Sequence, residues 1–465
     1  MIEVSNDFTQ RTETLFGKER YKIFKEALDT APSVSVRYNV AKYSNFEINN
    51  PVQWASNADY LDTRPSFTGD PLFHAGCYYV QEASSMFLEQ AIKQYIDAPV
   101  RALDIKQYID APVRALDLCA APGGKTTHLL SLLPEGSLLV ANEPMPLRAQ
   151  VLAENVIKWG NPSVMVTRNN PSDFASFRNF FDLIVVDAPC SGEGMFRKDS
   201  FAVEQWSVAN VMQCAERQRN ILSDIWATLR PGGLLVYSTC TFNREEDEDC
   251  VAWIAQELGA EVLPITTDKN WGITGNLTEG DEPVYRFIPG YTKGDGFFLS
   301  LLRKKGNEPL AQPRAQRVQP CATKLKKVVE QWIESPSTYD FIVQNDEITA
   351  YPKQHTNAIA ALCSKLKVQH AALPIAQVKG DKPIPLHTLA MSTALNRKMF
   401  HSVELEREEA LRYLHRETLS LINEPTGVLL LTYKGEPLGF AKNIGPRANN
   451  MYPSEWRIRK NPLEF

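Results

Sequence analysis

Short runs of apolar and β-branched residues alternate with helical stretches through the middle of the chain. The runs that predict strands cover 115–118, 137–141, 163–166, 183–187 and 234–238. Strands that alternate with helices in this way are typical of a parallel sheet with helices on both faces. We therefore expect a doubly wound α/β domain, in which ligands bind beyond the carboxyl ends of the strands.

The pattern is different on either side of this region. Apolar spacing predicts a helix from Lys18 to Asp29 and a strand from Val34 to Val40, which indicates a small α+β domain at the front. A polar stretch rich in Pro, Gln and Arg indicates a linker, and two strand-like runs near the end, 427–433 and 438–442, predict a small β-barrel. The predicted boundaries are 1–88 for the front domain, 89–305 for the doubly wound domain, 306–320 for the linker, 321–383 for a small α/β module that opens with a helix over 322–334, and 384–465 for the barrel.

Thirteen residues, IKQYIDAPVRALD, occur twice without change, at 92–104 and at 105–117. Stacked repeat architectures need three or more copies of a longer unit, so this repeat predicts none of them. A recent duplication, or an artefact of the sequence, accounts for it better than a function does. We assign the first strand of the sheet to the second copy and treat the first copy as an insertion that lengthens the preceding helix.

The composition is that of a globular enzyme, with 43% hydrophobic and 23% charged residues. No apolar run is long enough to span a membrane and the first residues have no signal-peptide pattern, so we expect a cytoplasmic protein. Eight cysteines without a Cys-x-x-Cys pair fit neither a disulfide framework nor a zinc ribbon. The thiols are therefore expected to be reduced.

The net charge of -5 is unevenly distributed. From Asn307 onward, 21 Lys and Arg stand against 16 Asp and Glu, and six of the basic residues lie close together between Lys434 and Lys460. Clusters of this kind attract polyanions, although most basic surface residues only solvate a face. Taken alone, the tail charges favour the interpretation that these residues only solvate the surface.

A small-residue loop, from Leu118 to Lys125 (LCAAPGGK), leads from the first strand into a helix. Small side chains let backbone N–H groups approach a nucleotide or a carboxylate closely. Gly124-Lys125-Thr126 matches the end of a P-loop, and Asp187 follows a strand as a magnesium-binding Asp would, but a P-loop requires Gly where Cys119 stands. The alternative is a cofactor that carries an adenosine, whose ribose an acid after the next strand would hold. Glu143 has that position, and a loop Glu on the surface is an equally good interpretation of position alone.

Two cysteines follow neighbouring strand-like runs on the same predicted edge: Cys190 in DAPCSGEG and Cys240 in YSTCTF. A lone cysteine is more often a small buried hydrophobe. Two at strand ends beside a cofactor loop are not well explained by packing. A thiolate that adds to C6 of cytosine makes C5 nucleophilic enough to attack a methyl sulfonium, and this chemistry requires a cysteine.

Together these residues resemble the Sun/Nop family of RNA (cytosine-5) methyltransferases, and within it the bacterial members that act on 16S rRNA. The resemblance covers most of the chain. It rests on YVQEASSM at 79–86, CAAPGGKT at 119–126, DAPCSGEGMFRKD at 187–199, YSTCTFNREED at 237–247 and GDGFF at 294–298. The tail resembles that family's PUA-like RNA-binding domain, and the front its small N-terminal domain, for which RNA binding is implied.

The resemblance implies a Rossmann-like methyltransferase sheet and S-adenosyl-L-methionine as cofactor. It implies that Cys240 attacks C6, that Cys190 assists release, and that Asp187 and Lys125 lie beside both cofactor and target base. The cofactor-binding residues that it implies are Cys119, Ala120, Ala121, Pro122, Gly123, Gly124, Lys125, Glu143, Asp187 and, on the adenine side, Asn170, where the family often has Asp.

The sequence thus predicts methylation of C5 of a cytidine in 16S rRNA through a covalent adduct with Cys240. The expected partner is 16S rRNA or the small ribosomal subunit, without a membrane and without a metal, and the protein is expected to be a monomer. Two alternatives remain open at this point. One is a P-loop NTPase, and the other is a non-catalytic RNA-binding factor for ribosome assembly, which would not need both thiols.

Overall fold

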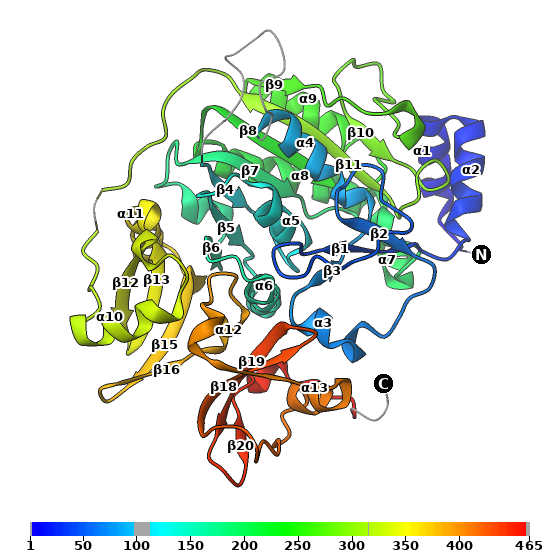
Figure 1. Ribbon diagram of the computed structural model, residues 1–465. Helices are drawn as coiled ribbons and strands as arrows, with labels where there is room; N and C mark the ends of the chain where they lie inside the picture. The colour runs from blue at the N-terminus through cyan, green and yellow to red at the C-terminus, as the bar shows by residue number, and fades with distance from the viewer. Residues whose placement is uncertain (1, 97–111, 315, 462–465) are drawn as a thin grey trace.

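The computed structural model describes residues 2–96, 112–314 and 316–461. The central sheet and its helices fill the upper part of Figure 1, the N-terminal helices pack on its right side, and the C-terminal sheets lie below in yellow to red. No helix in the described part of the chain has the length and apolar character needed to cross a bilayer.

The N-terminal segment is a small α+β unit whose sheet has the antiparallel order β2-β1-β3. Its first helix begins after Ser5, whose hydroxyl accepts a hydrogen bond from the Phe8 backbone nitrogen. The predicted helix and strand are confirmed as α2 and β1. The elements are α1 (Asn6–Phe16), α2 (Lys18–Leu28), β1 (Val34–Tyr38), β2 (Ala58–Leu61), α3 (Pro71–His74) and β3 (Tyr78–Val80).

A nine-stranded sheet forms the centre of the molecule. In spatial order its strands are β10 (Tyr285–Phe287), β11 (Phe297–Lys304), β8 (Leu229–Thr239), β7 (Phe181–Asp187), β4 (Arg114–Asp117), β5 (Leu138–Asn142), β6 (Val164–Thr167) and β14 (Val368–Ala371), with β9 (Ala260–Leu263) beside β11. The five predicted strands, β4 to β8, are confirmed and run parallel. The other four pair antiparallel, so the sheet is mixed where the sequence predicted a parallel one.

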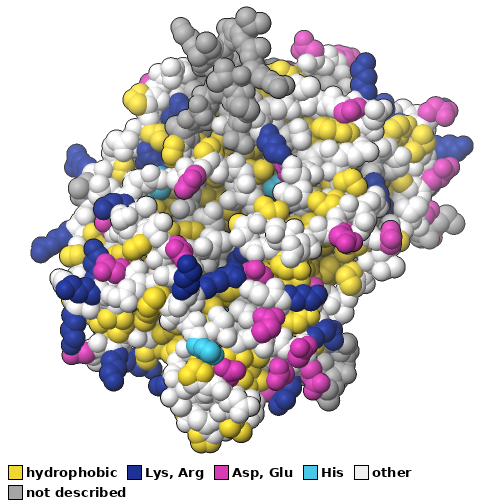
Figure 2. All heavy atoms as spheres, in the orientation of Figure 1, with side chains coloured by type: hydrophobic (Ala, Val, Ile, Leu, Met, Phe, Trp, Pro, Cys, Tyr) yellow, Lys and Arg dark blue, Asp and Glu magenta, His cyan; other side chains and the backbone are white. Residues whose placement is uncertain are grey.

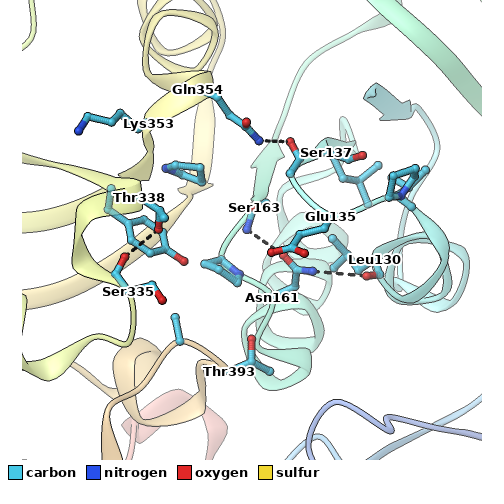
Figure 3. Close-up of a pocket in the computed structure, with 18 of the residues that line it drawn as sticks. Leu130, Glu135, Ser137, Asn161, Ser163, Ser335, Thr338, Lys353, Gln354 and Thr393 are labelled. Atoms are coloured by element: carbon cyan, nitrogen blue, oxygen red, sulfur yellow. Dashed lines mark hydrogen bonds between the residues drawn. The ribbon is translucent and has the colours of Figure 1, made fainter. Parts of the chain in front are cut away.

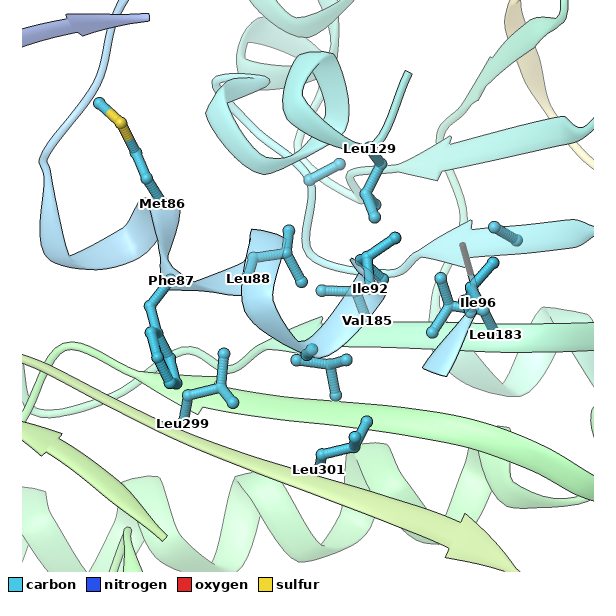
Figure 4. Close-up of a cluster of buried hydrophobic side chains, with 14 of the residues drawn as sticks. Met86, Phe87, Leu88, Ile92, Ile96, Leu129, Leu183, Val185, Leu299 and Leu301 are labelled. Atoms are coloured by element: carbon cyan, nitrogen blue, oxygen red, sulfur yellow. The ribbon is translucent and has the colours of Figure 1, made fainter. Parts of the chain in front are cut away.

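Helices cover both faces of this sheet. They are α4 (Leu88–Tyr95), α5 (Gly124–Leu132) and α6 (Pro146–Trp159) on one face, and α8 (Val208–Trp226) and α9 (Glu248–Glu257) on the other, with the short α7 (Ser200–Gln205) before α8. Figure 4 shows Leu88 and Ile92 of α4 against Val185 of β7. The next residue along that strand toward its start, Ile184, packs in the opposite cluster with Leu222 of α8. This alternation buries β7 on both faces.

The two copies of the thirteen-residue repeat supply different elements. The first copy contributes Ile92 to Tyr95 to the end of α4, and the second contributes Arg114 to Asp117 as β4. The strand is therefore assigned to the predicted copy. The predicted lengthening of the helix falls largely on residues 97–111, outside the described residues.

Two further sheets lie in the C-terminal part. The first is antiparallel with the order β12-β13-β15-β16, and the second has the order β17-β18-β19-β20. Their elements are α10 (Thr323–Val329), β12 (Tyr339–Gln344), β13 (Glu347–Pro352), α11 (Thr356–Lys365), β15 (Leu373–Lys379), β16 (Lys382–Pro385), α12 (His387–Met391), β17 (His401–Glu404), α13 (Arg407–Leu414), β18 (Gly427–Tyr433), β19 (Glu436–Asn443) and β20 (Ala448–Asn450). The predicted strands near the end are confirmed as β18 and β19.

The last described sheet is open and does not close into the predicted barrel. Its faces are covered by other parts of the chain. Leu429 and Leu431 pack with Val36 and Tyr78 of the N-terminal unit, while Leu430 packs with residues of the β12–β16 sheet. A sheet that is buried on both faces does not need closure to shield its apolar residues.

Lys and Arg side chains gather on the left side of the face in Figure 2, over the region of α10 and the β12–β16 sheet. Acidic side chains are interspersed among them. The surface of the C-terminal part is therefore mixed in charge, with local basic groups.

Candidate functional site

A cavity of about 370 Å³ lies at the carboxyl ends of β4, β7 and β8. Residues from three separate parts of the chain line it: the segment around β3, the loops after the central strands, and the start of β11. They are Tyr79, Val80, Gln81, Glu82, Ser85, Cys119, Ala120, Ala121, Pro122, Gly124, Lys125, Asp187, Gly194, Met195, Lys198, Cys240, Asp295, Gly296 and Phe297. The structure thus brings most of the predicted site residues to one cavity.

The loop from Leu118 to Gly123 is held close to the sheet by backbone hydrogen bonds. The Ala120 nitrogen donates to the Asn142 carbonyl at the end of β5. Gly123, with φ 114°, adopts a left-handed conformation as the N-cap of α5, which favours glycine. Free N–H groups of the first turn of α5 therefore face the loop, and a helix N-terminus of this kind is suited to an anionic group.

Asp117 ends β4 beneath this loop and is fully buried. The Thr126 hydroxyl donates to it at 2.6 Å, and burial raises its pKa to about 7. The side chain therefore ties the strand to α5 and does not line the cavity.

Lys125 and Asp187 form an ion pair inside the cavity, with Nζ 2.9 Å from Oδ2. The Ser238 hydroxyl donates to the other carboxylate oxygen at 2.8 Å, and the ammonium group lies 4.9 Å from the centre of the Phe297 ring. The Asp187 side chain is 37% exposed, so this carboxylate is accessible from the cavity. The pair can offer a hydrogen-bond acceptor and a cation side by side.

The two predicted cysteines are in contact, with their sulfur atoms 3.2 Å apart. They meet because β7 and β8 are neighbours, paired at Asp187 and Ser238, so that the following loops start side by side. Cys240 lines the cavity and Cys190 does not. The hydrogen bond with Cys240, together with burial, raises the pKa of Cys190 well above its ordinary value.

Glu143 and Asn170, predicted to contact the cofactor, do not line the cavity. Glu143 is buried at the end of β5, where it accepts a hydrogen bond from the Met145 nitrogen at 3.0 Å. Asn170 is exposed and caps a 3₁₀ turn at Pro171–Phe174. Its neighbour Asn169 is buried and bonds to the backbone of Lys367, next to β14. Gly123 is also absent from the lining.

Several residues of the site had no predicted role. Arg37 of β1 is buried, donates to the Gln81 side chain at 2.9 Å and to the Thr127 hydroxyl of α5 at 2.6 Å, and so joins the N-terminal sheet to the loop helix. Asp295, in an ion pair with Lys198, lies on the far wall. The quoted segments YVQEASSM, MFRKD and GDGFF were the available signal for Gln81, Lys198 and Asp295, whereas nothing in the sequence singled out Arg37.

A larger cavity, of about 1000 Å³, lies elsewhere, between the central sheet and the C-terminal part. Figure 3 shows Ser137 and Ser163, which precede β5 and β6, facing Thr338 and Gln354. This is the amino end of the strands, opposite the thiols. Its lining contains no cysteine, so it cannot be the site of the thiol chemistry.

A third cavity, of about 830 Å³, is a basic groove near the end of the chain, lined by Arg416, Thr418, Asn449, Asn450, Ser454, Glu455, Arg457 and Arg459. Within the described residues, none of its three arginines forms an ion pair, while Glu455 accepts a hydrogen bond from the Ser454 hydroxyl. The groove is suited to a polyanion.

In the described part of the chain, no group of three or more His, Cys, Asp or Glu is arranged to hold a metal.

Comparison with protein families gives three matches along the chain. The family described as "16S rRNA methyltransferase RsmB/F" matches residues 110–303. The "N-terminal domain of 16S rRNA methyltransferase RsmF" matches residues 4–83, and the "Methyltransferase RsmF PUA domain" matches residues 400–458. The first match contains all the loops that follow the parallel strands.

Individual relatives agree with these matches. The "Ribosomal RNA small subunit methyltransferase F" of Enterobacter sp. (strain 638) is 30% identical over 427 residues, which is 87% of this chain and 83% of the relative. That of Serratia proteamaculans (strain 568) is 32% identical over 433 residues, or 89% and 86%. A solved structure of a methyltransferase homologue from Pyrococcus horikoshii is 27% identical, with a TM-score of 0.54 over 65% of this chain and 96% of that one. The structure of NSun6 from the same organism with SFG, 19% identical with a TM-score of 0.53 over 65% and 99%, shares the fold.

Proposed function

The chain belongs to the RsmB/F family of 16S rRNA methyltransferases, and from this premise we propose that it methylates C5 of a cytidine in 16S rRNA with S-adenosyl-L-methionine, through a covalent bond between Cys240 and C6. The relatives named for the small ribosomal subunit support the substrate class. The position on the base and the adduct rest on the two thiols.

The observation that carries the proposal is the arrangement of these thiols. Cys240 lines the cavity that also holds Lys125 and Asp187, and Cys190 lies 3.2 Å behind it. The neighbouring Cys240 sulfur and burial raise the pKa of Cys190, so Cys190 is poorly suited to act as the attacking thiolate. A thiolate, and not a thiol, is the nucleophile.

The steps follow from this geometry. The Cys240 thiolate forms a bond to C6, and the electron pair of the C5–C6 double bond is delivered to C5 as an enamine. When bound, S-adenosyl-L-methionine would supply the methyl group for C5 from its sulfonium sulfur, which would keep the electron pair of the broken carbon–sulfur bond, and the loop from Cys119 to Lys125 would hold the cofactor. A general base then takes the proton of C5, the freed electron pair re-forms the C5–C6 double bond, and the C6–sulfur bond breaks with its electrons left on Cys240, which regenerates the thiolate. We assign assistance in this last elimination to Cys190.

The loop from Cys119 to Lys125 and the N-terminus of α5 are the proposed cofactor contacts, with Glu143 for the ribose and Asn170 for the adenine side. The amides of the α5 first turn fit the cofactor's carboxylate. Lys125 and Asp187 are proposed to hold the base, because a carboxylate can accept from the exocyclic amine of cytosine.

Around this domain, proposed to span 89–305, the segments 1–88 and 384–465 are proposed to contact rRNA. Residues 306–320 are the proposed linker, and 321–383 the proposed small α/β module, whose β14 joins the central sheet. The basic groove with Arg416, Arg457 and Arg459 supports the assignment for the tail. A target cytidine must leave its stack to reach Cys240, and contacts to neighbouring phosphates would hold the RNA while it does so.

The two cysteine variants test the mechanism. Cys190→Ala is expected to methylate once and remain attached to its RNA, as an adduct that survives denaturing electrophoresis. Cys240→Ala is expected to form no adduct and to have almost no turnover, and the double variant should behave like Cys240→Ala. An adduct in Cys240→Ala that disappears in Cys190→Ala would reverse the two roles. Methylation intact in both variants, without an adduct, would exclude thiol catalysis.

A further inference from the structure

Two buried carboxylates lie beneath the thiols, and each belongs to one cysteine loop while it bonds to the other. Glu193 follows Cys190 by three residues, and Glu246 follows Cys240 by six. Both are almost inaccessible, with exposures of 1% and 0%. Neither side chain lines the cavity that holds Cys240, and Glu193 lines instead a second cavity beside α1 and α9.

Glu246 holds the loop of Cys190. Its carboxylate accepts hydrogen bonds from the Ser191 backbone nitrogen at 3.0 Å and from the Gln218 amide at 2.7 Å. The same amide also donates to the Pro189 carbonyl at 3.1 Å. Both neighbours of Cys190 in the chain are thus fixed through Glu246 and its partner.

Glu193 holds the loop of Cys240 in return. One of its oxygens accepts from the Thr241 hydroxyl at 2.7 Å and from the Phe242 nitrogen at 2.6 Å. The other accepts from the Trp206 indole at 2.8 Å. In addition, the Gly194 nitrogen donates to the Cys240 carbonyl at 2.8 Å, where a Cβ at position 194 would lie only 2.9 Å from that oxygen.

Asn243 joins the two halves. Its amide nitrogen lies 2.7 Å from Glu246 and 3.1 Å from Glu193, and the Ser191 and Thr241 hydroxyls beside it are 3.1 Å apart. A buried network in which nearly every polar atom has a partner fixes one arrangement and makes alternatives costly. Burial raises the pKa of Glu246 to about 7, as expected for a carboxyl with no cation among these partners.

We propose that Glu193 and Glu246 are positioning residues that act as a crossed brace: Glu246 holds Cys190 in place for release of the methylated RNA, and Glu193 holds Cys240 in place for addition to C6. This inference rests on the proposed function. The two carboxylates therefore act on different steps of one reaction, although they lie in the same network.

The test uses the full-length enzyme with a fragment of 16S rRNA and S-adenosyl-L-methionine, and follows a single turnover. Glu246→Gln and Glu193→Gln keep the side-chain size but replace one acceptor oxygen by an NH₂ group. The surrounding N–H groups are donors and cannot accept a hydrogen bond from it. Methyl transfer is measured with labelled cofactor, and the adduct by denaturing electrophoresis. Asp182→Asn is the control, because Asp182 is a buried carboxylate at the opposite end of β7, bonded to Arg114 and Arg230.

Glu246→Gln is expected to accumulate the RNA adduct, as Cys190→Ala does, with release slowed about tenfold and methyl transfer changed less than about threefold. Glu193→Gln is expected to slow adduct formation about tenfold without accumulation. Asp182→Asn should leave the ratio of the rate of adduct formation to the rate of release unchanged, even if it lowers the melting temperature. Conversely, if both brace variants lower both rates in proportion to their loss of stability, the brace is only structural and the inference is overturned.

Failure of the underlying mechanism gives a different result. If Cys190→Ala itself accumulates no adduct, the proposed function fails, and if Cys190→Ala accumulates it while Glu246→Gln does not, only the brace fails. Should Glu246→Gln not fold, Gln218→Met removes the amide that links Glu246 to Pro189 and should shift the same ratio in the same direction. No shift in a folded Gln218→Met would then overturn the assignment of Glu246 to release.

Discussion

Glu143 lies at the end of β5 with one carboxylate oxygen bonded to the Met145 nitrogen and the other 3.3 Å from the Arg148 guanidinium. If it also accepts from two ribose hydroxyls, Glu143→Ala should weaken cofactor binding by roughly 1 to 3 kcal/mol, because a charged acceptor is lost. Calorimetric titration in EDTA measures the change, and binding in EDTA also argues against a Mg-nucleotide site.

Arg148→Ala is the matched control for Glu143→Ala. It removes the exposed partner of the ion pair, together with a bond to the Ala121 carbonyl at 3.1 Å, and leaves the carboxylate, so the dissociation constant should rise less than in Glu143→Ala. An affinity for the cofactor that is the same in Glu143→Ala and the wild type would contradict the ribose role.

His387 is expected to make the folded protein less stable in acid. Its ring packs edge-on against Tyr452 and Trp456, both ring nitrogens are buried without a hydrogen-bond partner, and burial lowers its pKa to about 3. Between the unfolded value of 6.5 and this folded value the unfolded chain binds the extra proton, so stability is lost as the pH falls below 6.5. His387→Phe should remove about 2 kcal/mol of the loss between pH 7.5 and pH 5.

Urea unfolding at the two pH values measures this effect. The relevant quantity is the difference between the two free energies of unfolding, because the substitution also changes packing at both. A pH dependence that is identical in His387→Phe and the wild type would show that His387 does not carry the effect.

The sequence identifies reactive residues better than those that position them. Cys190, Cys240 and the small-residue loop stand at strand ends, where the pattern predicts a ligand site. Glu193 and Glu246 could not be separated from surface acids, since their burial comes from tertiary contacts. Glu246 bonds to Gln218 of α8, and Trp206, the partner of Glu193, packs in one cluster with Phe8 of α1.

At the scale of elements, the end of α6 is where three parts of the chain meet. The carbonyls of Lys158, Trp159 and Gly160 accept hydrogen bonds from Lys42, from Asn39 and from Thr393 respectively. Gly76 approaches the same helix end so closely that a Cβ would lie 1.8 Å from the Lys158 carbonyl oxygen. The N-terminal unit can dock here only because position 76 has no side chain.

Gly76→Ala should therefore lower the free energy of unfolding by about 2 to 4 kcal/mol, in part through its positive φ and in larger part through the clash. Gly259→Ala isolates the first cause, because Gly259 has a similar φ of 68° with nothing within 4 Å of its Cβ position, against 73° at Gly76. It should cost about 1 kcal/mol. Equal losses in urea unfolding would contradict a role of the contact.

The thirteen-residue repeat gives a second test at this scale. Since α4 takes its end from one copy and β4 is taken from the other, removal of residues 97–109 leaves a single copy that supplies both. A shorter connection lowers the entropy cost of closing the loop, so the deletion should stabilise the protein by about 1 kcal/mol and leave methylation intact. A deletion variant that does not fold would show that the longer connection is needed to join α4 to β4.

The parallel strands were predictable and the antiparallel ones were not. β4 to β8 are buried on both faces, and their runs of apolar residues are recognisable. β10 has only three residues, which is too short for a recognisable pattern. β14 pairs with β6, about 200 residues earlier in the chain, so its local pattern does not indicate the sheet to which it belongs. The antiparallel edges therefore follow from tertiary contacts.

At the scale of the whole molecule, the basic groove of the tail should contribute to RNA affinity. Arg416→Ala, Arg457→Ala and Arg459→Ala together should weaken RNA binding and lower the slope of log K against log salt by about 2 to 3, because each lost phosphate contact releases one counterion fewer. Cofactor affinity should not change. Replacement of the three by Lys keeps the charge and should keep most of the slope, and an unchanged slope in the Ala variant would exclude the groove as a phosphate site.

Point variants are preferable to truncation, because the N-terminal unit and the tail share one hydrophobic cluster. Leu411 and Leu429 of the tail pack in one cluster with Val36 and Tyr78 of the N-terminal unit. Removal of the tail would expose this apolar surface, and a loss of activity could then come from unfolding alone.

During synthesis this shared cluster cannot form until the tail has been made. Chains emerge from the ribosome at roughly 5 to 20 residues per second, so Tyr78 waits on the order of 20 to 70 seconds before Leu411 is made. Until then the N-terminal sheet lacks the side chains that cover it, and a chain that stops early keeps this surface exposed to proteases and chaperones. The N-terminal sheet is therefore covered, and shielded from proteases, only after the tail has been translated.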